Sequence, residues 1–402
     1  MACGLPVLEL DGDSTRHIFP EGVVLFSPPH PVEIAASIRG ALSSPDLLAR
    51  TAARALEWVS QFSWEKAGAD VERAITDKLG LTETVARARR SGAGKHSVKA
   101  SVCIPTLNGG PLLLKVVNRV LEQTAPWGFE LLIMDSTSDD GSIERLPKHP
   151  ALRVERIERR SFQHGRTRNM LADRARGEYI AFLTQDALPL DHTWLYNFVT
   201  VLAHFPDAAG AFGRHYAWPE ASPFTRRDVN SGFEAFGADH LRLTRDTDPK
   251  RYENGDIGWR QRLHFFSDNN ALLRRAVWEK IPYPDVDFGE DQVWADRIIA
   301  AGYAKVYVPS AAVFHSHDYT PDETRKRMRV EADFFRANFG YVLYDPNTPF
   351  EEQVARMNTG DRAWGRKNSV SENEIDARCQ QNLARMLGYR DSYEAHLVSA
   401  AA

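Results

Sequence analysis

From Ala100 onward, apolar stretches at strand spacing alternate with apolar stretches at helical spacing, and this alternation constrains the fold more than any other feature of the chain. SVCIP predicts a buried strand, LLLKVVNRVLEQ a helix, and FELLIMD a second strand that ends on Asp135. LRVERIE follows, and GEYIAFLTQD predicts a further strand that ends on Asp186. Strands separated by helices indicate an α/β fold with a mostly parallel sheet flanked by helices. Ligands of such sheets bind beyond the carboxyl ends of the strands.

The chain divides into four predicted segments. Near the N-terminus, the short strand LPVLEL, a loop rich in Pro and Gly, and two helical stretches predict a small, partial Rossmann-like α/β segment. ARARRSGAGKHSVK is basic and lacks an apolar period, which is typical of a linker. A helix is predicted from about Pro321 to Asn338, and the sequence after Tyr344 is polar and weakly patterned. The predicted boundaries are 1–80 for the N-terminal segment, 81–98 for the linker, 99–345 for the main domain and 346–402 for a C-terminal extension.

The composition excludes several classes of protein. A formal net charge of -4 argues against a general nucleic-acid binder, which would carry a basic excess. Cys3, Cys103 and Cys379 lie far apart and show no metal-ligand spacing, and this use of cysteine favours a reducing cytoplasm. No apolar run approaches the roughly 20 residues that span a bilayer, and the N-terminus does not resemble a secretory signal. We therefore expect a cytoplasmic protein without a nucleic-acid partner.

Two carboxylates, Asp135 and Asp186, fall at predicted strand ends. Asp135 precedes STSDDG, a turn-forming polar cluster that could hydrogen-bond a base or a ribose. Taken alone, each carboxylate fits a capped loop better, because Asp and Ser populate turns for conformational reasons. At neighbouring strand ends of one sheet, however, the two together indicate a ligand site.

Two further carboxylates, Glu290 and Asp291, begin a stretch of helical spacing that ends at Gly302. One interpretation is that they complement the helix dipole; the other is that one of them is a general base on a rigid element. Because a helix N-terminus favours the ionised form, we expect such a base to be charged at neutral pH and weak. A positioned base typically contributes about 10² to 10⁴ in rate.

Two polar clusters lie near these acids in sequence. HSH closes the predicted strand VYVPSAAVF, and side chains two apart on a strand share a face, so His315 and His317 would point the same way, as a divalent metal or a diphosphate requires. A single histidine there would usually be structural. Asp268, Asn269 and Asn270 begin an apolar stretch, where they suit recognition of sugar or acceptor hydroxyls and equally suit a helix cap.

From about Lys99 to Asp345 the sequence resembles family 2 inverting glycosyltransferases of the GT-A fold, and in particular bacterial rhamnosyltransferases. The resemblance depends on the order of five segments, namely SVCIPTLNGG, LLIMDSTSDDG, HGRTRNMLADRARGEYIAFLTQDALP, FFSDNNALLRRAVWEKIPYPDVDFGEDQVWADRIIAAGY and VFHSHDY. It implies a role in nucleotide binding for Thr106, Asn108, Asp135, Arg168 and Asn169. It further implies that Asp186 is the metal-site carboxylate and that Asp291 is the general base, with Glu290 beside it.

The metal motif departs from the broader family, because TQD replaces D-x-D. Rhamnosyl-type members often carry the same TQD, so the departure resembles a subfamily variation. We expect Asp186 to hold a Mg²⁺ or Mn²⁺ ion whose other ligands are the diphosphate, water and the candidates His315 and His317. A hard divalent ion takes many of its ligands from substrate phosphates and water, so the site can bind the ion with one protein ligand fewer.

The resemblance implies a single displacement from a nucleotide-diphospho-sugar with inversion of configuration. By resemblance alone the donor is dTDP-L-rhamnose, and the acceptor is a surface polysaccharide such as O-antigen or a lipid-linked glycan. Acceptors of that kind lie at the inner face of the bacterial membrane. TRKRMRVEADFFRANFGY, with basic residues near Phe334, Phe335 and Phe339, therefore has two interpretations: peripheral contact with anionic lipid, or a core-packing helix with a solvated basic face.

The first residues resemble a different family. MACGLPVLELDGDSTRHIFPEGVVLFSPPHPVEIAASI and FSWEKAGADVE are similar to the final part of a family 4 glycosyltransferase of the GT-B fold. In that family the acidic donor motif lies mostly upstream and would here precede Met1. We expect this segment to be inert as a transferase, either as the remnant of a fusion or because the gene begins earlier.

Two other classes of function share some of these features. A nucleotidyltransferase would also use strand-end carboxylates and a divalent ion, but it needs a basic Gly-rich loop after the first strand, and IPTLNGG contains no basic residue. A non-catalytic sugar-nucleotide-binding or scaffolding module would need no base at Asp291.

Overall fold

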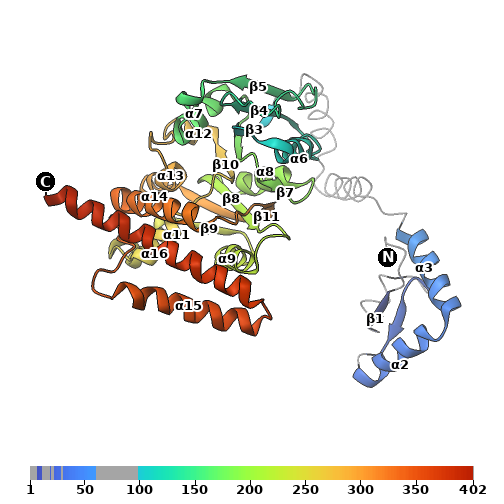
Figure 1. Cartoon of the computed structure of the whole chain (residues 1–402). Helices are drawn as coiled ribbons and strands as arrows, with labels where there is room; N and C mark the ends of the chain where they lie inside the picture. Colours follow the sequence, from blue (N-terminus) through green and yellow to red (C-terminus); the bar gives the residue numbers. More distant parts are fainter. Residues whose placement is uncertain (1–6, 11–18, 20–21, 29, 60–97, 402) are drawn as a thin grey trace. The chain divides into compact units, whose positions relative to one another are not determined.

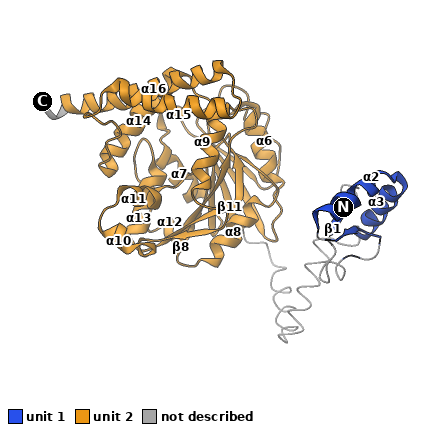
Figure 2. Cartoon of the chain, turned by 90° about the horizontal axis from the view of Figure 1, so that it is seen from below, with its two compact units in different colours: residues 1–95 blue, residues 96–402 orange. Residues whose placement is uncertain are grey.

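A computed structural model describes residues 7–10, 19, 22–28, 30–59 and 98–401. The chain forms two compact units, residues 1–95 and 96–402 (Figure 2). The segments MACGLP and FSWEKAGADVE and nearly all of the predicted linker lie outside the described residues.

The N-terminal unit contains a pair of short strands and two helices. Its elements are β1 (Leu8–Leu10), β2 (Leu25–Ser27), α2 (Pro31–Leu42) and α3 (Pro45–Val59). The two strands are parallel. Ala55 of α3 is fully buried in a small apolar cluster with Val23 and Val24. This unit is the small α/β segment that the sequence predicts.

The second unit is built around a nine-stranded sheet (Figure 1). Its strands are β3 (Val98–Thr106), β4 (Gly128–Asp135), β5 (Leu152–Arg156), β6 (Tyr179–Leu183), β7 (Leu188–Pro189), β8 (Ala208–Tyr216), β9 (Leu241–Leu243), β10 (Asn270–Arg274) and β11 (Ala304–Phe314). They lie in the order β5-β4-β3-β6-β10-β8-β11-β7, and β9 pairs with β11.

The sheet is mixed, with a parallel half and a half that contains antiparallel pairs. β5, β4, β3 and β6 are parallel to their neighbours, as is β8 to β11, whereas β10 runs antiparallel to both β6 and β8. The α/β fold with flanking helices is confirmed. The segment NALLR, for which a helix cap was one alternative at Asp268–Asn270, is instead the central strand β10, so the helical alternative is wrong. A short apolar run does not distinguish a buried strand from a helix by its periodicity.

Helices cover both faces of the sheet. They are α6 (Gly110–Leu121), α7 (His164–Arg174), α8 (Trp194–His204), α9 (Pro223–Glu234), α10 (Pro249–Glu253), α11 (Ile257–His264), α12 (Arg275–Trp278) and α13 (Glu290–Ala300), with 3₁₀ turns at Arg159–Ser161 and Arg245–Thr247. Side chains alternate between the faces along each strand. On β3, Val102 and Ile104 join the core beneath α6 and α8, and Cys103 joins the core beneath α7 and α13.

The C-terminal extension is helical, which its weak apolar pattern did not predict. α14 (Pro321–Phe339), α15 (Phe350–Lys367) and α16 (Glu372–Ala401) pack together (Figure 1). A Cβ on Gly388 would lie 2.4 Å from the carbonyl oxygen of Arg325, so the missing side chain permits the close approach of α16 to α14. Arg325 adds two hydrogen bonds, of 2.6 and 2.9 Å, to Asp391. Contacts with another helix, rather than a continuous apolar stripe, stabilise this segment.

The phenylalanines of α14 pack inside the protein. Phe334 and Phe339 are buried with Tyr341, and Phe288 and Phe335 pack against them. These rings therefore fit the core-packing interpretation of the helix and are not available to a lipid surface. Among the described residues, no helix combines the length and the apolar character needed to cross a membrane.

Candidate active site

A pocket of about 400 Å³ lies beyond the carboxyl end of β6, and we call it the central pocket. Its walls come from the turn after β6, the residues before β10, the first turn of α13 and the segment after β11. These walls supply the side chains of Asp186, Asn269, Glu290, Asp291, His315 and His317. The acid at the strand end and the acids at the helix tip, distant in sequence, therefore share one cavity.

Asp186, His315 and His317 form a group that could hold a metal ion, with one ligand atom from each lying within 4.8 Å of the others. Nε2 of His317 is 3.3 Å from one carboxylate oxygen of Asp186, and Nε2 of His315 is 3.7 Å from the other. Both histidines follow the end of β11 at Phe314, and a hydrogen bond of 2.9 Å from the His315 amide to the Tyr216 carbonyl continues the pairing with β8. The two imidazoles converge on one acid, as their spacing predicts.

The chemistry of this group suits a divalent ion. Burial lowers the pKa of His315 to about 4, so its imidazole is neutral at physiological pH and offers a lone pair. One carboxylate and two imidazoles are a mixed oxygen and nitrogen set, which suits Mn²⁺ better than Mg²⁺. The residues therefore fit a metal, with coordination positions left for phosphate and water.

The first turn of α13 carries Glu290 and Asp291, and Gly289 before it makes this placement possible. Gly289 adopts φ 70°, a left-handed conformation that favours glycine. A Cβ at this position would also lie 2.3 Å from the ring of Phe334. The glycine thus allows a sharp entry into the helix and close packing of α14 behind the acids.

Asp291 is half-buried, and its carboxylate accepts hydrogen bonds from two backbone amides, those of Asp268 at 3.1 Å and Gln292 at 2.8 Å. Burial and, secondly, the neighbouring Glu290 raise its pKa to about 7. The expectation of a fully charged, weak base at the helix tip is therefore wrong. Desolvation and repulsion between the two acids outweigh the helix dipole, whose effect is typically below about 1 kcal/mol at an exposed site.

Arg168 of α7 lies behind the acids and is almost fully buried. Its Nη1 donates a hydrogen bond of 2.8 Å to Glu290, and its Nε lies 3.3 Å from a carboxylate oxygen of Asp268. Tyr283 donates a hydrogen bond of 2.6 Å to the other oxygen of Asp268. Burial raises the pKa of Asp268 well above its usual range. Glu290 is thus held by an arginine, whereas no cation contacts Asp291 among the described residues.

Three of the residues expected to hold the nucleotide, Thr106, Asn108 and Asp135, lie at or just after the ends of β3 and β4. Asp135 is fully buried and accepts hydrogen bonds from the Ser138 amide and from Nε of Arg156. Asn108, at φ 50°, accepts a hydrogen bond of 2.9 Å from the amide of Asp139, so the loops after β3 and β4 are joined. These three residues do not line the central pocket, whereas Arg168, which was also expected at the nucleotide, does.

Gln185 connects these loops to the metal group. Its Oε1 accepts hydrogen bonds from the hydroxyl of Thr106 at 2.5 Å and the amide of Leu107 at 3.0 Å. Its Nε2 donates a hydrogen bond of 3.2 Å to the carbonyl of Leu107. The amide side chain in TQD therefore fixes the loop after β3, while the adjacent Asp186 faces the two histidines.

Two further residues expected in the site, Asn169 and Asn270, form hydrogen bonds with the protein interior through their side chains. The amide of Asn169 binds the Trp278 indole and the backbone of Tyr283. That of Asn270 binds the indole of Trp194 and the carbonyl of Ala311. Neither residue lines the central pocket, whereas Asn269 does.

Several residues of the central pocket were not expected. Tyr319 and Arg327 contribute from α14 and the segment before it, and Thr184 places a buried hydroxyl that lacks a hydrogen-bond partner among the described residues. Tyr319 and Thr184 lie within segments that carried the family resemblance, but nothing in their own spacing marked them. The position of α14 beside α13 could not be read from local sequence.

A mixed α/β sheet with a candidate metal-ligand group and two helix-tip carboxylates at the strand ends defines a candidate group-transfer enzyme. Residues 101–281 match the family described as Glycosyl transferase family 2. The chain is 29% identical over 233 residues to the O-antigen chain rhamnosyltransferase RfbN of Salmonella typhimurium, covering 57% of this chain and 70% of that protein. It is 28% identical to the O-antigen chain rhamnosyltransferase WbaN of Salmonella anatum, with 56% and 69% covered. On these similarities the chain is a glycosyltransferase.

Two solved structures show weak similarity to the chain. The mannosyltransferase PcManGT from Pyrobaculum calidifontis, in complex with GDP-Man and Mn²⁺, has 19% identity and a TM-score of 0.44, with 82% of this chain and 87% of that chain covered. TarS of S. aureus, residues 1–349, has 17% identity and a TM-score of 0.42, with 74% and 92% covered.

Proposed function

We propose that the chain transfers L-rhamnose from dTDP-L-rhamnose to a hydroxyl of a surface polysaccharide or lipid-linked glycan, with inversion. The observation that supports the proposal most is that the proposed base, Asp291, and the proposed metal group at Asp186 line one pocket of about 400 Å³. The rhamnosyl donor and the O-antigen-type acceptor are supported by the names of the two Salmonella relatives.

In the proposed reaction the acceptor oxygen bonds to the anomeric carbon while the bond from that carbon to the diphosphate oxygen breaks. The bond electrons leave with the nucleoside diphosphate, and the hydroxyl proton passes to a carboxylate oxygen of Asp291. Backbone amides of Asp268 and Gln292 fix the plane of that carboxylate. With a pKa of about 7, Asp291 is a stronger base than an ordinary aspartate and still partly ionised at neutral pH.

We propose that Asp186, His315 and His317 hold a Mn²⁺ or Mg²⁺ ion. When bound, such an ion stabilises negative charge on a departing diphosphate. Gln185 keeps the loop after β3 in place, and we assign the nucleotide to Thr106, Asn108 and Asp135 at that side. Arg168 orients Glu290, and Asn269 supplies an amide for a hydroxyl of the sugar or acceptor.

We make two further proposals, one about the N-terminal unit and one about the location of the protein in the cell. The N-terminal unit, with its parallel strand pair, is proposed as an inactive segment similar to part of a family 4 transferase. We also propose a cytoplasmic location, which the use of cysteine favours, and a place at the inner membrane face, which depends on the proposed acceptor class.

The test is thermal stabilisation by a panel of nucleotide sugars, with and without Mn²⁺, followed by measurement of transfer or hydrolysis of the best donor. We expect dTDP-L-rhamnose to stabilise the protein most, and to do so more strongly with Mn²⁺. Asp186→Asn should lose the Mn²⁺ contribution, whereas Asp173→Asn, an exposed aspartate on α7, should keep it. Stabilisation by another donor would overturn the sugar assignment, and Mn²⁺ dependence that survives in Asp186→Asn would overturn the metal site.

A further inference from the structure

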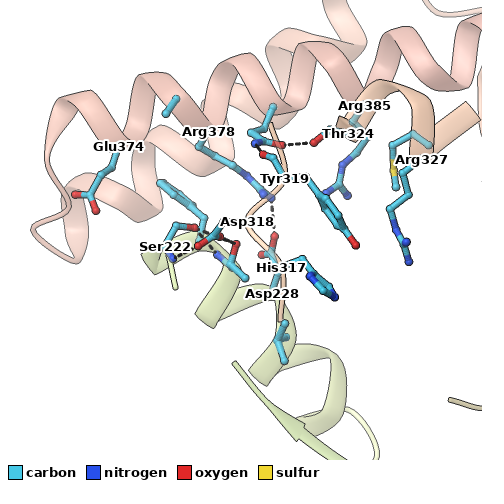
Figure 3. A pocket seen from close by; sticks show the side chains of 16 residues that line it. Ser222, Asp228, His317, Asp318, Tyr319, Thr324, Arg327, Glu374, Arg378 and Arg385 are labelled. Carbon is cyan, nitrogen blue, oxygen red and sulfur yellow. Dashed lines mark hydrogen bonds and ion pairs between the residues drawn. The ribbon is translucent and has the colours of Figure 1, made fainter. Parts of the chain in front are cut away.

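A second pocket, of about 440 Å³, lies beside the central pocket, between α9, the segment after β11, α14 and α16 (Figure 3). We call it the C-terminal pocket. His317, Tyr319 and Arg327 line both pockets, so the two cavities adjoin along these three residues. The C-terminal helices, which have no part in the proposed chemistry, form one wall.

Two arginines of the C-terminal pocket have no anionic partner in contact. Arg327 forms no hydrogen bond or ion pair within the described part of the chain, and its guanidinium lies 5.4 Å from the ring centre of Tyr319 and 5.7 Å from that of Phe288. Arg385 of α16 has a buried Nε without a hydrogen-bond partner among the described residues. A third arginine, Arg378, is by contrast bound to Asp228 and Asp361.

Neither of the two nearest acids contacts these arginines in the described part of the chain. Burial raises the pKa of Glu331, and the charges of Arg327 and Arg385 lower it to a smaller extent, but Glu331 forms no ion pair with either arginine. Asp318 accepts hydrogen bonds from Ser222 and Thr225 instead. In Figure 3, Arg327, Tyr319 and Arg385 lie at one end of the pocket and Glu374 at the other.

Arg385 is partly buried, and a buried guanidinium N–H without a partner is costly unless a ligand binds there, whereas Arg327 is exposed and its donors are free to bind a ligand. Arginine presents a planar set of donors that matches phosphate and carboxylate groups. Stacking on Tyr319 orients one of these arginines at the boundary with the central pocket.

We propose that the C-terminal pocket is the acceptor subsite and binds an anionic group, a phosphate or a carboxylate, that the acceptor glycan carries. The inference rests on the proposed function, which assigns the nucleotide to the side of Thr106 and Asp135. The acceptor must reach Asp291 from another side, and the C-terminal pocket opens next to it through Tyr319 and Arg327. Arg385 and Arg327 then bind the anionic group while a hydroxyl of the same molecule lies at Asp291.

The experiment measures binding of three probes by calorimetry: α-D-galactose 1-phosphate, D-glucuronic acid and neutral D-galactose. The protein is first saturated with a nucleoside diphosphate and Mn²⁺, so that phosphate probes cannot occupy the donor side. Arg385→Gln is compared with Arg329→Gln, which removes the same charge from an exposed position on α14 outside both pockets. Vesicles of phosphatidylcholine with and without phosphatidylglycerol test whether a lipid headgroup is the source of the phosphate.

We expect at least one charged sugar to bind more tightly than galactose, and Arg385→Gln to weaken that binding about 10- to 100-fold, as loss of a charge-assisted hydrogen bond does. Arg329→Gln should bind as the wild type does. The tighter charged probe identifies phosphate or carboxylate as the acceptor group. Binding only to the anionic vesicles, weakened equally by both substitutions, would overturn the subsite.

The proposal also fails if neither charged sugar binds more tightly than galactose, or if both variants lose affinity equally. If Arg385→Gln does not fold, Arg327→Gln is tested in the same assay. If charged sugars bind through Arg385 but no nucleotide sugar is consumed, the anion site stands and the proposed function fails. If transfer depends on Asp291 but no charged sugar is preferred, only the subsite fails.

Discussion

Replacement of Asp291 by Asn tests the proposed base, because activity and stability should change in opposite directions. Burial and, secondly, the neighbouring Glu290 raise the pKa of Asp291 from 3.8 to about 7, although the two backbone hydrogen bonds that its carboxylate accepts act to lower it. At 1.36 kcal/mol per pKa unit, this rise corresponds to about 4 kcal/mol of destabilisation once the carboxylate is ionised in the folded protein.

The sign follows from the protons bound in each state. Between about pH 4 and pH 7 the unfolded chain has lost the Asp291 proton and the folded chain still holds it, so the wild-type free energy of unfolding falls as the pH rises through this range. Asn cannot ionise and should remove this decline. Its amide must face the two backbone N–H groups with a single oxygen, which costs about 1–3 kcal/mol, so we expect a net stabilisation of about 1–3 kcal/mol at pH 8.

Activity should fall about 10²- to 10⁴-fold in the same variant, and the wild-type rate should increase with pH through about 7 as Asp291 ionises. Donor consumption measured against pH, together with urea unfolding at pH 5 and pH 8, checks both effects. Asp296→Asn is the matched control, because Asp296 lies on the same helix, has a pKa that burial raises, and does not line the central pocket. A rise in rate near pH 7 that persists in the Asn variant would exclude Asp291 as the base.

Three other substitutions test the surroundings of the acids. Gln185→Leu should weaken nucleotide binding about 10-fold, since it removes the hydrogen bonds that fix the loop after β3, and should leave Mn²⁺ affinity unchanged when both are measured by calorimetry. Arg168→Met should lower the free energy of unfolding by about 3–5 kcal/mol in urea titrations, because Glu290 loses its buried partner, and adding Glu290→Gln should restore part of the loss. Gly289→Ala should destabilise the fold and lower activity, because its Cβ would meet the ring of Phe334; an active variant of unchanged stability would contradict this account.

The sequence predicted the parts of the fold that local patterns determine. The strands β3, β4 and β6 are short apolar runs between helical stretches, and their parallel arrangement follows from the rules for α/β sheets, whereas the order of the strands came from the structure. The strand β10 was missed because NALLR is too short for its periodicity to separate strand from helix. Helix α16 was missed for a related reason: its position depends on contacts such as Gly388 against α14, which only the folded chain supplies.

In the candidate site, too, local sequence patterns predicted some features, and others depend on contacts that only the folded chain supplies. Positions at strand ends and at a helix start are local properties, so Asp186, Asp291 and the two histidines were found from the sequence, and the structure brings them into one pocket. The protonation of Asp291 was not predictable, because desolvation depends on residues that approach from distant segments. Asn169 was assigned to the nucleotide by the family resemblance and Asn270 to a hydroxyl because an amide suits one, yet the side chains of both bind tryptophan indoles.

In TQD the position of the first carboxylate of D-x-D is Thr184, which lines the central pocket and whose buried hydroxyl has no hydrogen-bond partner among the described residues. The middle residue, Gln185, holds the loop after β3 through Thr106 and Leu107. With His315 and His317, the proposed metal group has three protein ligands, and Asp186 is the one carboxylate among them. One carboxylate neutralises only part of the charge of a divalent ion. Compared with a site of two carboxylates, such a site depends more on the diphosphate to neutralise the rest. Mn²⁺ affinity should therefore rise when a nucleoside diphosphate is bound, and calorimetric titration of Mn²⁺ with and without the nucleotide measures that coupling, whose absence would contradict the assignment.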